Sequence, residues 1–282
     1  MHLSETIFLR IISMAGSKSS KWIAITAGLG TSDFERAAVR VGKDLSSAAV
    51  VDQVVVITTE EIFETCPITT KIYSDLIKSQ SRGFGFMSWK SELVNDAFAG
   101  KWGKYDGVIW IDAGCEVSMN SISKIFFHKY QDYAASNGVA AFTLRTPEIQ
   151  YTKQDLFDEF PELDPLDCGD QIQSTWIFFH GEIGRKAARR WFETVCKGTH
   201  LLDLQPSKRP ENPAFIENRY DQSSFSLVCK SLGIRPMNYK PTAGHGSFIS
   251  RIKGFTHPIW TARNRTGRTK KIKVNLLLEK FL

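Results

Sequence analysis

Two carboxylates follow a short hydrophobic run near the middle of the chain. Residues 108–111 are all apolar and include β-branched and aromatic members, a pattern typical of a strand buried on both faces. Asp112 follows directly, and Glu116 comes four residues later. Ligands of open α/β sheets bind at the carboxyl ends of strands, and hard divalent cations prefer oxygen ligands. The pair therefore predicts a Mg²⁺ or Mn²⁺ site, with a simple capping role for Asp112 as the alternative.

Residues 82–90, Arg-Gly-Phe-Gly-Phe-Met-Ser-Trp-Lys, combine two glycines, three aromatic side chains and two cations. Aromatic faces stack on a base or a sugar ring, and cations bind phosphate. This composition indicates a ligand-binding loop that uses Arg82, Trp89 and Lys90. A hydrophobic loop folded into the core has the same composition, so both interpretations stay open.

The order of the apolar and polar runs predicts alternating strands and helices. Strands are expected at residues 22–27, 54–57, 108–111, 139–144 and 174–179, and helices at residues 32–49, 91–99, 120–136 and 182–197, with a further helix from Asp221. Ser32 and Glu35 form a capping-box pattern for the first helix. An early strand–helix–strand unit predicts an α/β fold, with a mostly parallel sheet between helices.

Gly28 and Gly30 follow the first strand and could let the backbone approach a phosphate. The third glycine of a dinucleotide fingerprint is missing, because Asp33 stands in its place. A nicotinamide or flavin site is therefore not predicted. Residues 146–169 are acidic and aromatic, which suits either a lid or a solvated surface loop.

Further polar residues with a chemical role are expected in the second half of the chain. Asp221 and Gln222 supply a carboxylate beside an amide, which suits sugar hydroxyls, although Asp221 could equally cap its helix. Asp170 stands near the start of a strand. His245 and His257 are candidate metal ligands, with a surface position as the alternative for each.

Composition is that of an ordinary globular protein of 282 residues, with 42% hydrophobic and 23% charged residues. The formal charge of +6 is uneven, because residues 250–274 hold eight Lys or Arg and no acidic residue. Such a tail attracts polyanions or an anionic membrane surface, or is simply solvated. Five scattered cysteines predict no disulfide framework and indicate a cytoplasmic protein. The apolar run at residues 7–14 is too short for a membrane span.

Four motifs together resemble a family of bacterial glycosyltransferase-like proteins, similar to the GT-A enzymes of capsule and surface-polysaccharide gene clusters. They are residues 82–90, residues 110–116 (Trp-Ile-Asp-Ala-Gly-Cys-Glu), residues 219–226 (Arg-Tyr-Asp-Gln-Ser-Ser-Phe-Ser) and residues 257–265 (His-Pro-Ile-Trp-Thr-Ala-Arg-Asn-Arg). The order and spacing of the first three motifs make this resemblance more specific than any one motif would.

The resemblance implies a GT-A-like α/β/α sandwich over residues 21–265, with an N-terminal extension (1–20) and a basic tail (266–282). It implies a nucleotide-sugar donor, a glycan or lipid-linked acceptor, and a Mn²⁺ or Mg²⁺ cofactor. Gly114 stands where the metal motif usually has its second aspartate. The implied catalytic residues are Asp221 and Asp170, and the implied metal ligands are Asp112, Glu116, His245 and His257. The implied donor-binding residues are Thr26, Ala27, Arg82, Trp89, Lys90, Asp112, Ala113, Gly114, Gln222 and Arg263.

Three other functions fit parts of the sequence. An aspartate-dependent phosphotransferase also places an Asp after a strand, but it normally needs a second acid where Gly114 stands. A nucleic-acid or polyanion-binding protein would use the basic tail and the aromatic loop, although these are far apart in sequence and match no known nucleic-acid motif. A glycosyltransferase fold without activity is the third. Peripheral contact with the inner membrane face through the tail is compatible with the proposed transferase.

Overall fold

The apolar runs of the sequence form a five-stranded central sheet in the computed structural model, which describes residues 20–238 and 257–265. Both pairs that β1 makes, with β2 and with β3, are parallel, whereas β8 runs antiparallel to both of its neighbours. Four of the five strands therefore share one direction. Across the sheet the order is β2 (Gln53–Ile57), β1 (Trp22–Ala27), β3 (Gly107–Ile111), β8 (Trp176–His180) and β5 (Val139–Ala140).

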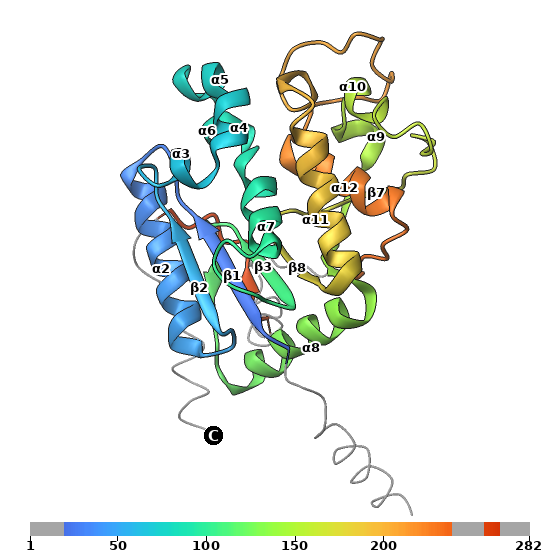
Figure 1. Ribbon diagram of the computed structural model, residues 1–282. Helices are drawn as coiled ribbons and strands as arrows, with labels where there is room; N and C mark the ends of the chain where they lie inside the picture. The colour runs from blue at the N-terminus through green and yellow to red at the C-terminus, as the bar shows by residue number, and fades with distance from the viewer. Residues whose placement is uncertain (1–19, 239–256, 266–282) are drawn as a thin grey trace, which may run out of the picture.

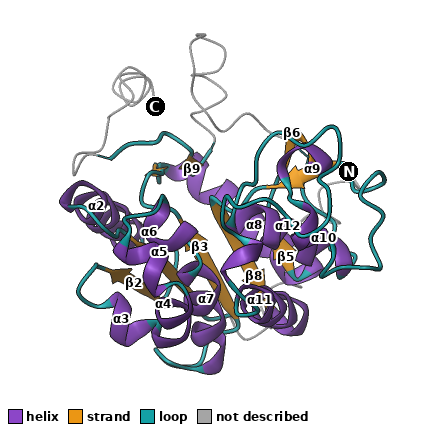
Figure 2. Cartoon of the chain, turned by 90° about the horizontal axis from the view of Figure 1, so that it is seen from above, coloured by secondary structure: helices purple, strands orange, loops and turns teal. Residues whose placement is uncertain are grey.

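Alternate side chains of each strand enter two separate cores, because successive side chains point to opposite faces of a sheet. In β1, Ile23 and Ile25 join one core and Trp22 and Ala24 join the other. The first core is covered by α7 (Trp89–Ala99) and α11 (Gly181–Val195). The second is covered by α2 (Ser32–Ala48) and α8 (Ser121–Asn137). Figure 2 shows the sheet between these helix layers, which confirms the expected α/β sandwich with a mostly parallel sheet.

The helix caps partly follow the sequence prediction. Asn120 caps α8 as expected, since its side chain accepts a hydrogen bond of 2.8 Å from Ser123 N. The predicted capping box of α2 is wrong by one residue, because Thr31 is the N-cap and its side chain accepts from Phe34 N. The Glu35 carboxylate reaches across to Thr59 N instead. It thereby ties the start of α2 to the loop after β2.

The sequence predicted one strand at residues 139–144, but this apolar run does not form a single strand. The chain leaves the central sheet after β5 and forms β6 (Thr143–Pro147), which pairs antiparallel with β7 (Asp170–Ile172) in a second sheet. The intervening residues 148–169 include two short helices, α9 (Glu148–Tyr151) and α10 (Gln154–Phe157). With α12 (Asp221–Ser231), these elements lie beside one end of the central sheet (Figure 1).

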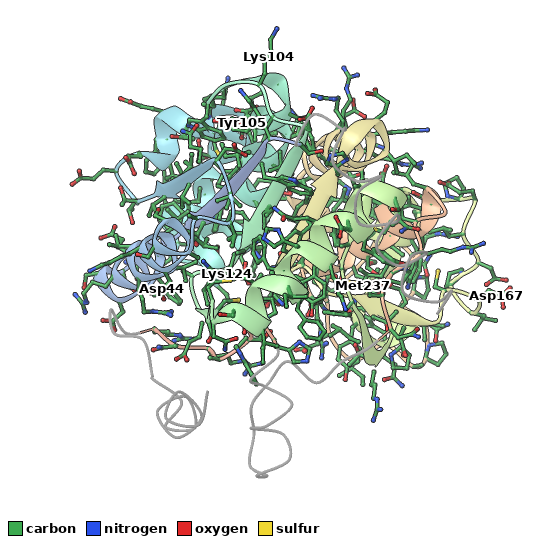
Figure 3. The ribbon with its side chains drawn as sticks, turned by 90° about the horizontal axis from the view of Figure 1, so that it is seen from below. Asp44, Lys104, Tyr105, Lys124, Asp167 and Met237 are labelled. Atoms are coloured by element: carbon green, nitrogen blue, oxygen red, sulfur yellow. The ribbon has the colours of Figure 1, made fainter. Side chains whose placement is uncertain are left out.

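The carboxyl ends of β1, β2 and β3 point toward a group of short helices (Figure 1). Figure 3 views the molecule from the opposite end, where Lys104 and Tyr105 precede β3 and the Tyr105 hydroxyl donates to Gln53 at the start of β2. In the part of the chain that the structure describes, no helix is long and apolar enough to cross a membrane. The short helices are α3 (Ile62–Thr65), α4 (Pro67–Ile72), α5 (Ser74–Lys78) and α6 (Gly83–Phe86), and a 3-10 turn at Thr199–Leu201 follows α11.

Candidate functional site

A buried lysine joins the two aspartates that the sequence singled out. Lys90 Nζ lies 2.7 Å from Asp112 Oδ1 and 2.8 Å from Asp221 Oδ2, although Lys90 and Asp221 are 131 residues apart. The side chains of Lys90 and Asp221 are only 3% and 4% exposed, whereas that of Asp112 is 29% exposed. Trp110 Nε1 donates a further bond of 2.8 Å to Asp112 Oδ1. One face of this cluster is therefore open at Asp112, and the rest is enclosed.

Burial and neighbouring charges both shift the pKa values of Lys90 and Asp112 in the Lys90–Asp112–Asp221 cluster. Burial alone would lower the pKa of Lys90, but the two carboxylates outweigh it and raise the pKa above its ordinary value. Burial raises the pKa of Asp112, and the nearby Asp221 carboxylate raises it further, against the opposing effect of Lys90. When all three side chains are ionised, the cluster carries one net negative charge.

Asp221 is held in the cluster by its own hydrogen bonds and by a strained neighbour. It is the first residue of α12. Its carboxylate accepts hydrogen bonds from Lys90 Nζ and from Ser174 Oγ, both at 2.8 Å, and does not cap the helix. Tyr220 before it has φ of 52° and ψ of −117°, which is an unfavourable conformation for a tyrosine. Phe86 stacks on Tyr220 with ring centroids 4.6 Å apart. This contact holds the strained residue, and with it Asp221, in place.

The sequence did not single out residues 173–175, which link β7 to β8 beneath the cluster. Ser174 binds Asp221, and Thr175 O accepts a bond of 2.8 Å from Asp112 N. The side-chain nitrogen of Gln173 is buried and has no hydrogen-bond partner within the described residues. The sequence signal that could have identified these residues is the polar Gln-Ser-Thr run directly before an apolar strand. Polar residues at a strand boundary are also the pattern that pointed to Asp112.

The aromatic loop at residues 82–90 forms a left-handed turn. Five consecutive residues, 83–87, have φ between 54° and 85°. Two i to i−4 backbone bonds, Phe86 N to Arg82 O and Met87 N to Gly83 O, close the turn at 2.9 and 3.0 Å. The left-handed helix costs about 1–2 kcal/mol for each residue that has a Cβ. Strain of this kind is concentrated at functional sites, where surrounding contacts maintain it.

Trp89 supplies one of the contacts that maintain this turn. Its indole N–H is shared between Gly83 O at 3.2 Å and Phe84 O at 3.1 Å, and the side chain is buried against Trp110. Its ring faces are therefore enclosed by protein. Arg82, by contrast, is exposed, with its guanidinium 5.6 Å from the centre of the Tyr220 ring.

Glu116 lies in a small sheet that the C-terminal part of the chain completes. It is in β4 (Glu116–Val117), which pairs antiparallel with β9 (Ile259–Trp260). Glu116 Oε1 accepts a bond of 2.8 Å from Asn264 Nδ2. Arg40 Nη2 donates to Ala113 O, Cys115 O and Asn264 O at 2.8–3.2 Å. These contacts fix the loop that carries Asp112 against the segment that carries Asn264.

The expected metal ligands do not form a complete metal centre. Within residues 20–238 and 257–265, no group of three His, Cys, Asp or Glu side chains is placed to hold a metal ion. His257 is buried, with Nδ1 lying 3.3 Å from the Tyr130 hydroxyl on the α8 side of the sheet. His245 lies outside the described residues. Because Glu116 binds Asn264, Asp112 is the member of the expected set whose carboxylate is partly open.

Several expected donor-binding residues lie around Asp112. Asn264 N donates to Gly114 O at 2.9 Å, and a Cβ on Gly114 would lie 3.5 Å from Arg263 Cα. A Cβ there would make ordinary van der Waals contact with the Arg263 backbone, so the two backbones lie side by side. Arg263 itself is exposed, with φ of 50°. Ala113 is buried against Ala37 and Ala38 of α2.

The remaining candidates lie at the ends of strands. Thr26 and Ala27 end β1 and are buried, and Thr26 Oγ1 has no hydrogen-bond partner within the described residues. Asp170 begins β7 and is exposed. Gln222 is half-buried next to Asp221, and its Nε2 donates a bond of 2.7 Å to Gln171 Oε1.

No protein-family model and no curated protein matches this sequence. Among solved structures, mouse xyloside xylosyltransferase 1 in its apo form is 12% identical with a TM-score of 0.46, covering 87% of this chain and 99% of that chain. A glycosyltransferase involved in glycosylation of the major capsid of PBCV-1 is 10% identical (TM-score 0.45; 85% and 91% covered). An active-site mutant of LgtC is 9% identical (TM-score 0.40; 84% and 86% covered).

Proposed function

We propose that this protein is a glycosyltransferase of the GT-A type, which moves a sugar from a nucleotide-sugar donor to a glycan or lipid-linked acceptor. The observation that carries the proposal is the Lys90–Asp112–Asp221 cluster, in which each residue comes from a different one of the first three motifs. The fourth motif contacts the second, because Asn264 binds both Gly114 and Glu116. The contact of three motifs in one cluster, with the fourth packed against the loop that follows Asp112, supports the proposal.

The transfer forms a bond between an acceptor hydroxyl oxygen and the anomeric carbon of the sugar. The bond from that carbon to the diphosphate oxygen breaks, and the diphosphate leaves with the electron pair. Positive charge near the diphosphate stabilises this developing charge. Arg263 is suited to that role, because it is exposed and its backbone lies against Gly114, two residues after Asp112. Lys90 instead holds Asp112 and Asp221 in position.

The acceptor hydroxyl must also lose a proton, and a carboxylate is the usual base for this step. Asp221 is enclosed, with one oxygen bound by both Lys90 and Ser174. Asp170 is exposed at the start of β7, next to the residue that binds Gln222. Of the two expected catalytic carboxylates, Asp170 is the one open to an acceptor, and Asp221 is the one suited to ordering the site.

The described residues do not assemble the ligands of a Mn²⁺ or Mg²⁺ ion. A divalent cation is still the cofactor that the motif resemblance implies, with Asp112 as its first ligand. A role in surface-polysaccharide synthesis, in the cytoplasm or at the inner membrane face, belongs to the proposal on the same ground. The basic tail (266–282) that is expected to contact the membrane lies outside the described residues.

A thermal-shift titration tests the proposal with nucleoside diphosphates and with UDP- and GDP-sugars, each with and without Mn²⁺. A ligand at 100 times its Kd stabilises the folded state by about 2.7 kcal/mol. For a protein of this size that corresponds to a rise in Tm of roughly 5–10 °C. We expect such a rise with one nucleotide family in the wild type, and its loss in Asp112→Ala. No shift with any nucleotide, together with salt-sensitive binding to oligonucleotides, would favour the polyanion-binding function instead.

A further inference from the structure

A second buried polar network lies directly behind Gln222 and takes no part in the Lys90 cluster. Its centre is Glu148, whose side chain is fully buried and pairs with Lys230. Glu148 Oε1 accepts from Thr152 Oγ1 at 2.5 Å and from Gln171 Nε2 at 3.1 Å. Glu148 Oε2 accepts from Ser226 Oγ. Every polar atom of this carboxylate therefore has a donor, and the carboxylate can act only as an acceptor.

This environment fixes which way round the Gln171 amide lies. Its Nε2 lies 3.1 Å from Glu148 Oε1 and 3.1 Å from Tyr151 O, two atoms that can only accept. It also lies 3.1 Å from Thr152 Oγ1 and 3.2 Å from Ser223 Oγ. Those two hydroxyls already donate elsewhere, to Glu148 and to Tyr151 O, so toward Gln171 they accept. The NH₂ group of Gln171 must point into this set of acceptors, and its oxygen must point the other way.

The orientation of Gln171 then sets the orientation of Gln222. Gln171 Oε1 accepts from Gln222 Nε2 at 2.7 Å, so Gln222 must present its NH₂ group to Gln171. The Gln222 side-chain oxygen points away from that bond and is left to accept. Gln222 is half-buried and follows Asp221 in the chain, and its oxygen is not among the buried side-chain atoms that lack a partner in the described residues, so this oxygen is open to solvent. A flip of the Gln222 amide would bring two oxygens together at Gln171.

We propose that Glu148 and Gln171 are positioning residues, which orient the Gln222 amide so that its carbonyl oxygen accepts a hydrogen bond from a sugar hydroxyl. This inference rests on the proposed glycosyl transfer. It adds a specificity element to the site, because a fixed acceptor selects a substrate that offers a hydroxyl donor at that position. A substrate without that hydroxyl would cover the Gln222 oxygen and leave it without a hydrogen-bond donor, which costs binding free energy.

A double-mutant cycle tests the inference with Gln171→Leu, Gln222→Ala and the combination. The readouts are kcat for sugar transfer and the Kd for the nucleoside diphosphate alone. If Gln171 acts through Gln222, Gln171→Leu lowers kcat about tenfold and changes that Kd by less than about twofold. In the Gln222→Ala background it then has no further effect on kcat.

Gln131→Leu is the matched control, because Gln131 is also a buried glutamine, with Nε2 bound to Val50 O at 3.2 Å on the α8 side of the sheet. We expect it to lower Tm by an amount similar to Gln171→Leu while leaving kcat unchanged. If Gln171→Leu does not fold, Gln171→Met replaces it in the cycle. The positioning role would be overturned if the losses of kcat in the two single variants multiplied in the double variant, or if Gln131→Leu lowered kcat as much as Gln171→Leu does. Either result would leave the proposed glycosyl transfer intact. A wild type that turns over no nucleotide sugar would overturn both proposals.

Discussion

At the scale of single residues, the candidate site uses one buried cation to hold two carboxylates. Taking a charge out of water is costly, so Lys90 is stable there because two acids neutralise it. The three ionised groups leave one excess negative charge, and Asp112 is the member whose carboxylate is partly open. A site with an unsatisfied negative charge at its opening suits a cationic ligand or a hydroxyl donor, and is costly to the stability of the empty protein.

Asp112→Asn is expected to stabilise the protein at neutral pH. Burial raises the pKa of Asp112 above its ordinary value of 3.8, so the folded state binds the proton more tightly than the unfolded chain does. The contribution of Asp112 to the free energy of unfolding therefore falls as pH rises above about 4, toward the raised pKa of the folded state. Asparagine imitates the protonated carboxyl and avoids this loss. The measurement is Tm from pH 3 to pH 8.

We expect the Asp112→Asn variant to have the higher Tm at pH 7, and the difference to shrink toward pH 4. Asp167→Asn is the control, because Asp167 is exposed in the loop before β7. A wild type that is the more stable of the two across the whole pH range would show that the ion pair with Lys90 outweighs burial of the carboxylate.

At the scale of elements, the left-handed turn at residues 83–87 and the strained Tyr220 support each other. Phe86 of the turn stacks on Tyr220, and Arg82 lies over the same ring. Trp89 closes the other side of the turn through its indole N–H. Two costly backbone conformations thus meet at one contact, immediately beside the residues that bear the chemistry. At this contact the intrinsic backbone preferences of the residues are overridden, as is common beside functional sites.

Gly85→Ala tests how tightly the turn is held. Gly85 has φ of 85°, and an added Cβ would lie 3.0 Å from Ile77 and 3.4 Å from Tyr73. Both the left-handed backbone and the crowding oppose a side chain there. We expect the free energy of unfolding to fall by about 2–3 kcal/mol in a denaturant titration.

Gly100→Ala is the comparison for that variant, because Gly100 has φ of 95° at the end of α7 and an added Cβ would meet only Gly103 O, at 3.7 Å. Its loss should be limited to about 1 kcal/mol for the backbone alone. If the free energy of unfolding fell equally in the two variants, the side chains around Gly85 would be able to move aside for a Cβ, and the turn would not be tightly packed.

At the scale of the whole molecule, the sequence predicts the parts whose pattern is local. The apolar runs predict β1, β2, β3 and β8 to within two residues at either end, and Asn120 and Gly138 mark the limits of α8. The run at residues 139–144 was predicted as one strand. Hydrophobicity does not report that the chain changes sheets after Ala140, because residues on both sides of the change are apolar.

The candidate site is less predictable than the fold, because its contacts join distant segments. Asp112 and Asp221 stand out in the sequence by residue type and position. Only the folded chain shows that Lys90 pairs with both of them. Trp89 and Glu116 have residue types that suit ligands, and the structure surrounds both with protein partners. Gln171 gave no signal, since its role depends on the four acceptors that surround its amide.

Turnover of a nucleotide sugar is the measurement that tests the central claim most directly. Release of nucleoside diphosphate should be followed for a panel of UDP- and GDP-sugars, with glycan and lipid-linked acceptors present or absent. The wild type is expected to turn over one nucleotide family, and Asp112→Asn, which removes the expected first ligand of the divalent cation, to be slower by at least about tenfold while remaining folded. Asp167→Asn is expected to match the wild type. Turnover by none of the donors, or full turnover in the Asp112→Asn variant, would contradict the assignment of this cluster as a glycosyltransferase site.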